Sequence, residues 1–374
     1  MRFLVFLVVL FLSFSVYEAQ DPIIIELLIG MYVDLAPGTP KQDVSVGAIN
    51  MFIGEMLFVD QNCGKHLTDC PRYCQDPAFF RAYCPLGCDP NLNSIDRRLY
   101  CGSYKTTSYK SNESSTFEIV QPFKKWSYQT AHYRSFEGIW ISDVIQSLYD
   151  NKTFGSFRFV DLFYYDIRFG AMNVVLGIAP SKNGLAYQLY EQQKIDRPVL
   201  TIIPNDGLGG WLIYGEKANK SYCHEDQWTA HATIHPNHWL LKAESIQIGD
   251  QVYSNQIITF GFDYGIQIPA YQLSSLLKRR ILFQPSEVLL TAPCNSTKLD
   301  LTIRIGNRTI FIPSNKTINQ FVYDYKSGLC TTHISSIPTA SYTNTTTWIF
   351  GSLITYCLFF DYEHMNVELG TRVD

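Results

Sequence analysis

The residue best placed for chemistry is Asp263, which lies in the apolar segment IITFGFDYGIQIP, residues 257–269. An acid at the tip of an apolar strand is costly unless another group stabilises its charge. A turn would also explain it, because Asp before a Gly suits a turn. A catalytic role needs a second acid, since two carboxyl groups that share one proton can activate a water and also hydrogen-bond a carbonyl.

Histidines offer a second possible chemistry, at positions 224, 231, 235 and 238. On one strand, His231 and His235 would lie about 13 Å apart at ~3.3 Å per residue, too far for one metal ion to bridge. We therefore expect a surface or packing role, with no metal site and no cofactor.

The first 19 residues have the features of a signal peptide. Arg2 is followed by ten apolar residues, Phe3 to Leu12, and then by small residues up to Ala19. A membrane-spanning helix needs ~20 apolar residues, and no later segment reaches that length either. We expect a secreted protein with no stable membrane span, in the extracellular space or in the lumen of the secretory or endolysosomal pathway.

Other features agree with secretion. Ten cysteines suit disulfides in an oxidising compartment, and six of them crowd residues 63–101. Zinc is an alternative for two C-x3-C pairs there, but the compartment favours disulfides. A net charge of −4 gives no electrostatic signature of nucleic-acid binding. Seven sequons indicate N-glycosylation: Asn112, Asn151, Asn219, Asn295, Asn307, Asn315 and Asn344.

Strand patterns dominate the chain, so we expect an all-β fold with a few short helices. Leu299 to Ile312 predicts a hairpin around Gly306-Asn307, and residues 199–214 and 245–253 predict two more strand–turn–strand units. Helical spacing appears at 185–195 and 270–282, while 141–149 could be helix or strand.

Five motifs in order extend over the chain beyond the signal: GMYVDLAPGTPKQDVSVGAI at residues 30–49, NVVLGIA at 173–179, the GFDYG segment, the pair Cys294 and Cys330, and WIFGSLITYCLFFDYEHMNVELG at 348–370. Together they resemble the pepsin-like aspartic peptidases. The resemblance implies a bilobal all-β fold, with two β-barrel-like lobes and a central cleft between them. It implies an N-terminal lobe over residues 20–204, with a cysteine-rich insertion at 63–101, and a C-terminal lobe over 205–374. It also implies that Gly177 and Gly351 each lie beneath a loop, near residues 48–51 and near Asp263.

The resemblance makes Asp263 the acid of the second lobe, with Gly265 at the small third position of the same motif. Tyr264 departs from the family, which has a Thr or Ser there. The acid of the first lobe should fall at Ile49 or Asn50, and neither can share a proton as a carboxyl group does. Asp43 and Asp60 lie outside that loop. Glu55 is the nearest acid, but the loop would have to re-form around it.

Further expectations follow from the same resemblance. Tyr133 takes the place of the tyrosine on the flap that closes over the cleft, although a buried aromatic residue is the simpler interpretation. Cys294 and Cys330 match a disulfide of the second lobe, which leaves Cys223 and Cys357 to pair. The first expected strand, residues 23–28, follows the signal so closely that no basic pro-segment fits between them.

The expected function is therefore that of a non-catalytic pseudopeptidase, a monomer that binds a peptide or a protein in the interlobe cleft. One alternative is an active aspartic endopeptidase with an atypical first loop. Another is a structural or defensive secreted glycoprotein whose exposed surface matters.

Overall fold

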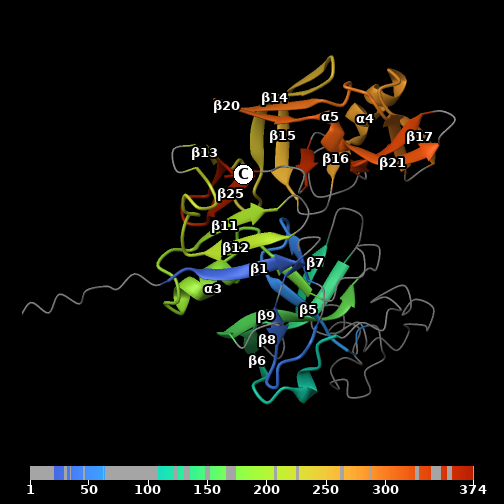
Figure 1. Cartoon of the computed structure of the whole chain (residues 1–374). Coiled ribbons are helices and arrows are strands. Elements are labelled where there is room, and N and C mark those ends of the chain that lie inside the picture. Colours follow the sequence, from blue (N-terminus) through green and yellow to red (C-terminus); the bar gives the residue numbers. More distant parts are fainter. Residues whose placement is uncertain are drawn as a thin grey trace, which may run out of the picture.

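The computed structural model of the protein describes residues 21–28, 32–33, 35–44, 47–61, 63, 108–120, 125–129, 135–147, 152–165, 174–205, 209–224, 227–261, 265–286, 289–324, 328–337, 347–351 and 356–373. These residues form mostly β-strands with a few short helices, so the expected all-β class is confirmed (Figure 1). Asp263, Tyr264, Tyr133, Asn151, Asn344, the signal segment and all of the cysteine-rich segment except Cys63 lie outside the described residues.

The largest sheet has fifteen strands and contains both early and late segments of the chain. Along the main path its strands are β13 (Thr229–Ala232), β26 (Asn366–Thr371), β25 (Tyr356–Asp361), β11 (Val199–Pro204), β12 (Gly210–Tyr214), β1 (Ile23–Leu28), β2 (Tyr32–Val33), β4 (Gly47–Asn50), β10 (Val174–Gly177), β5 (Met56–Val59), β9 (Thr153–Tyr165), β8 (Ser135–Gln146) and β3 (Ala36–Pro37). Two more strands, β6 (Glu118–Ile119) and β7 (Lys125–Gln129), pair with β8. The lobe boundary expected after residue 204 falls between the two strands of the β11–β12 hairpin.

Two smaller sheets come from residues 241–350. One has seven strands in the order β20 (Arg308–Ile312), β19 (Leu301–Ile305), β14 (Leu241–Ile248), β15 (Gln251–Phe260), β24 (Thr347–Phe350), β16 (Ile266–Pro269) and β23 (Ile334–Ile337). The other has four, in the order β17 (Phe283–Ser286), β18 (Leu289–Pro293), β22 (Leu329–Thr332) and β21 (Ile318–Asp324). The described helices are η3 (Ser111–Glu113), α3 (Leu185–Glu191), α4 (Ala270–Lys278) and α5 (Ser314–Thr317).

Local patterns predicted many of these elements. The hairpins β19–β20, β11–β12 and β14–β15 form where the turn residues indicate them. Both long helices end earlier than their apolar spacing suggests, because Gln193 and Arg280 adopt left-handed φ values of 55°. A left-handed residue just past the last turn ends a helix. The ambiguous residues 141–146 belong to strand β8.

One four-strand arrangement occurs twice. Strand β10 pairs parallel with β4 and antiparallel with β5, and β5 pairs parallel with β9. In the same way β24 pairs parallel with β15 and antiparallel with β16, and β16 pairs parallel with β23. In each unit the strand that arrives last along the chain lies between the first two. The loops 51–55 and 261–265 therefore occupy equivalent positions.

A buried contact links these units at Trp239, whose side chain is completely buried. Its indole Nε1 donates a hydrogen bond to the Ile178 carbonyl oxygen at 2.5 Å, just after β10. The Trp239 carbonyl oxygen accepts one from Thr259 Oγ1 at 2.9 Å, on β15. Trp239 therefore connects the end of β10 in the first unit to β15 in the second unit.

None of the helices among the described residues has the length and apolarity that a membrane crossing requires.

Candidate functional site

The two equivalent loops are held by glycines of the paired apolar-apolar-Gly segments. Gly177 N donates to the Glu55 carbonyl oxygen at 3.0 Å, and Gly351 N donates to the Gly265 carbonyl oxygen at 2.7 Å. Gly177 also pairs with Asn50 in the strand register. The expected positions are thus confirmed for Gly177 beside the first loop, and Gly351 bonds a residue two positions after Asp263. A Cβ on Gly177 would stand 2.4 Å from the Glu55 carbonyl oxygen, so only Gly fits there.

The two loops differ in length by one residue. Counted from the strand residue beside each glycine to the residue whose carbonyl oxygen the glycine bonds, the first segment has six residues, Asn50 to Glu55, and the second has five, Gly261 to Gly265. Between Asn50 and Glu55 the first segment has Met51, Phe52, Ile53 and Gly54, and none of these is an acid. Ile53 is 1% exposed. Ile49 lies within β4 and pairs with Leu176, so it is not a loop residue.

Asn50 shapes the first loop through its side chain. Its Oδ1 accepts hydrogen bonds from the backbone N–H groups of Phe52, at 2.8 Å, and Ile53, at 3.0 Å. Such a side-chain bond to the backbone two or three residues on is a common way to stabilise a turn. The Asn50 amide therefore holds loop backbone groups and does not present its acceptor to a ligand.

Glu55 is the acid of the first loop. Its side chain is half-buried, and Oε1 accepts a hydrogen bond from Ser181 Oγ at 3.0 Å. Burial raises the pKa of the Glu55 carboxyl above its ordinary value, and the bond from Ser181 offsets part of that rise. A carboxyl group with a raised pKa can hold a proton closer to neutrality than an exposed one.

Gly265 is required by the backbone of the second loop. Its φ of +128° is rarely adopted by residues with a side chain, and a Cβ would stand 2.4 Å from the His333 carbonyl oxygen. The backbone conformation and the close His333 carbonyl oxygen therefore both require glycine at position 265.

Two histidines lie beside the first loop. The rings of His235 and His238 stack with centroids 4.6 Å apart, and His238 also contacts Phe52 of the loop at 6.2 Å. Burial lowers the pKa of His238, and the neighbouring His235 lowers it further. The sequence grouped these histidines correctly, but nothing in it indicated the contact with Phe52.

The structure also contains a buried pair of carboxyl groups that sequence reasoning missed. Asp60, just after β5, is 2% exposed, and Asp161, on β9, is 1% exposed. The two buried carboxyl groups interact with each other, which favours a proton on one of them. Burial raises the pKa of Asp161 well above its usual range, and the charge of Asp60 adds to the effect. The pair lies 101 positions apart in the sequence, so no local pattern reveals it.

Three further polar residues lie beside this pair of carboxyl groups. The Tyr109 hydroxyl donates to Asp143 Oδ2 at 2.6 Å, and Thr116 Oγ1 donates to Asp143 Oδ1 at 2.5 Å. Asp143 and Tyr109 are completely buried. Burial raises the pKa of the Tyr109 phenol, and its bond to Asp143 raises it further.

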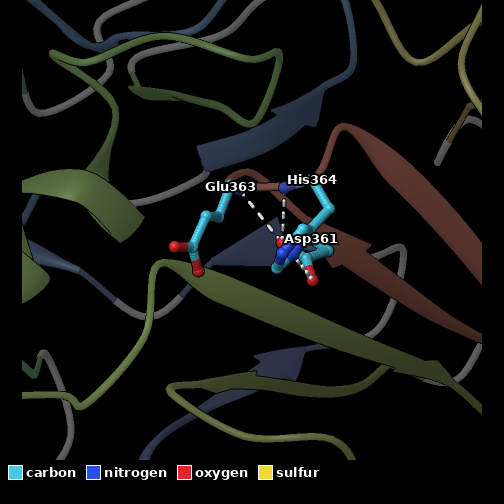
Figure 2. A group of neighbouring side chains, drawn as sticks. All are labelled: Asp361, Glu363 and His364. Carbon is cyan, nitrogen blue, oxygen red and sulfur yellow. Dashed lines mark hydrogen bonds and ion pairs between the residues drawn. The ribbon is translucent and has the colours of Figure 1, made fainter.

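Asp361, Glu363 and His364 are the three neighbouring side chains that could be considered for a metal ion within the part of the chain that the structure describes (Figure 2). Asp361 Oδ1 accepts from the backbone N–H groups of Glu363 and His364, both at 3.0 Å. Its Oδ2 accepts from His364 Nδ1 at 3.0 Å and from Arg197 Nη2 at 2.9 Å. Because the guanidinium already neutralises the carboxylate, this group is the cap of a turn.

Two disulfides join described cysteines. Cys294 bonds Cys330, as the resemblance implies, and Cys223 bonds Cys357. Cys63 is also disulfide-bonded. The sequons within the described residues, Asn112, Asn219, Asn295, Asn307 and Asn315, all have exposed side chains.

Comparison with known proteins gives no family. The sequence matches no protein-family model, and it has no significant similarity to any curated protein.

Proposed function

We propose that this chain is a secreted pepsin-like protein with two lobes, and that it binds a peptide or a protein in the cleft between them without cleaving it. One observation carries the proposal: the first of the two equivalent loops has no acid between Asn50 and Glu55, whereas the sequence of the second contains Asp263. The twofold occurrence of the four-strand unit supports the resemblance to the family.

The chemistry explains why one acid is insufficient. Peptide hydrolysis of this kind uses one carboxylate to activate a water and a second, protonated acid to hydrogen-bond the scissile carbonyl. Removing a general acid or base costs about 10²–10⁴ in rate. The first loop offers a buried isoleucine, Ile53, and an Asn50 amide that already accepts hydrogen bonds from backbone N–H groups.

Exposed sequons and disulfides support the secreted part of the proposal. Glycosylation requires accessible asparagines, and every described sequon is exposed. Disulfides persist in oxidising compartments.

Glu55 favours one alternative, an active aspartic-type endopeptidase with an atypical first loop. It is an acid in the first loop, and its raised pKa would suit a proton donor. Against this, its side chain is bonded to Ser181, and its place in the loop corresponds to Gly265 and not to Asp263.

A proteolysis assay separates the two functions. Purified protein would be incubated with acid-denatured globin at pH 3–6, with and without pepstatin, beside the variants Asp263→Asn and Glu55→Gln. We expect no cleavage by any of the three proteins. Pepstatin-sensitive cleavage by the natural sequence that both variants abolish would establish the endopeptidase and overturn the proposal.

Binding is tested separately with a displayed library of random peptides. Enriched sequences should bind the natural protein and lose affinity for Phe52→Ala, a change in the first loop, while Ile119→Ala on an exposed strand leaves affinity unchanged. A library that yields no binder at pH 5 or pH 7 would contradict the binding function.

A further inference from the structure

The strand β20, Arg308–Ile312, forms one edge of the seven-stranded sheet. In its register with β19, Ile305 faces Arg308 across a two-residue turn, and Ile303 faces Ile310. Hydrogen-bonded and non-hydrogen-bonded pairs alternate along antiparallel strands. The backbone groups of Thr309 and Phe311 therefore point away from β19, and no described residue hydrogen-bonds to them.

The side chains of this edge do not discourage pairing. Thr309 is exposed, and Phe311 is 56% exposed, among the most exposed large apolar residues of the described chain. The charge of Arg308 is turned away, because its guanidinium stacks on Tyr356 and donates to the Gln227 carbonyl oxygen. An apolar edge strand with open backbone groups is a template for pairing with another chain.

Two other edge strands carry the usual protection, whereas β13 and β23 have no proline within the strand. Strand β3 contains Pro37, and strand β17 contains Pro285 together with a register irregularity. Proline and bulges are common devices against edge-to-edge pairing. Strand β20 has neither between Arg308 and Ile312.

Instead, a sequon lies at each end of β20. Asn307, in the sequence N-R-T, is the second residue of the hairpin turn, and Asn315, in N-K-T, lies three residues beyond the strand. Both side chains are exposed. Five strand residues span about 17 Å, so two bulky surface glycans would flank the whole length of the open edge.

We propose that N-linked glycans on Asn307 and Asn315 cover the open edge of β20 and prevent two copies of the chain from pairing through it. This assignment rests on the secreted part of the proposed function and is independent of proteolysis and of ligand binding.

The test begins with protein secreted from a eukaryotic host, in which glycopeptide mapping should find both sites occupied. Thr309→Ala removes the first sequon, whereas Thr309→Ser keeps it, and Asn315→Gln removes the second. Ser221→Ala is the matched control, because it deletes the sequon of Asn219 and leaves the bond from Ser221 N to Asn219 Oδ1 intact.

Sedimentation velocity then measures self-association. We expect Thr309→Ala/Asn315→Gln to associate at least about tenfold more tightly, equivalent to ~1.4 kcal/mol, than Thr309→Ser or Ser221→Ala. Adding Phe311→Lys should restore the monomer, since a charge on an edge opposes pairing. If the double variant is not secreted, glycosidase treatment of the folded natural protein should produce the same association.

Unoccupied Asn307 and Asn315 would overturn this proposal and leave the absence of proteolysis untouched. So would a double variant or deglycosylated protein that remains as monomeric as the Ser221→Ala control. Cleavage of globin, in contrast, would overturn the proposed function and leave the glycan assignment standing.

Discussion

Among single residues, Asp161 and Asn50 are polar side chains with different structural roles. Asp161 lies in the interior beside Asp60, whose charge helps to raise its pKa, and its Oδ1 has no hydrogen-bond partner among the described residues. Asn50 is neutral, and its side-chain oxygen accepts hydrogen bonds from two backbone N–H groups of the loop. Both residues therefore contribute to stability in ways that can be measured without knowing a ligand.

For Asp161 we expect a stability that depends on pH. Because the pKa in the folded protein is raised above the ordinary value of 3.8, the contribution is fully present below about pH 4 and is lost as pH rises through the folded pKa. The urea concentration at the midpoint of unfolding should decrease in the natural protein as the pH rises above about 4. Asp161→Asn should flatten this dependence, and the exposed Asp43→Asn should not. Equal slopes in all three proteins would show that the pair carries no shared proton.

For Asn50 we expect a contrast between two variants. Asn50→Ala leaves the N–H groups of Phe52 and Ile53 without their acceptor, which should lower the free energy of unfolding by about 1–3 kcal/mol. Asn50→Asp keeps the acceptor and should stay within ~0.5 kcal/mol of the natural protein. Urea unfolding at pH 7 measures both, and an Ala variant as stable as the Asp variant would contradict the loop-capping role.

At the scale of elements, each copy of the four-strand unit has a glycine whose backbone N–H bonds the loop beside it. We expect Gly177→Ala to lower the free energy of unfolding by about 3 kcal/mol or more, because its Cβ would meet backbone atoms of Ile53 and Glu55. Gly328→Ala is the comparison, since Gly328 has a φ of +66° but open space around it. That change should cost only ~1–2 kcal/mol. Urea unfolding measures both variants. Similar decreases in the free energy of unfolding would mean that the backbone around residue 177 moves to make room for the added Cβ.

The same elements show what sequence could and could not predict. The hairpin β19–β20 and helix α4 follow from alternation and turn residues close together in the chain. The glycine segments VVLG and WIFG were recognisable, and their positions beside the loops followed from the resemblance. The Asp60–Asp161 pair, the contact of His238 with Phe52 and the role of Trp239 depend on contacts between distant segments, which no local pattern encodes.

For the whole molecule, the two described disulfides close loops of different length, 134 residues for Cys223–Cys357 and 36 residues for Cys294–Cys330. In the chain-entropy account they contribute about 5 and about 4 kcal/mol. We expect Cys223→Ser/Cys357→Ser to destabilise more than Cys294→Ser/Cys330→Ser in urea unfolding at pH 7. The reverse order would show that local packing, and not loop closure, governs their contribution.

The fifteen-stranded sheet also has a consequence for how the chain is made. Strand β1 pairs with β12, and β11 pairs with β25, so neighbours in this sheet leave the ribosome far apart in time. At a synthesis rate of about 5–20 residues per second, residues 23–28 wait on the order of ten seconds or more for residues 210–214, and β11 waits again for residues 356–361. During that delay one edge of β1, and later one edge of β11, lacks its partner strand, although β2 and β12 can already pair with the other edges. A nascent chain with such high contact order folds slowly and exposes strand edges, so its production should depend on chaperones that occupy unpaired strands.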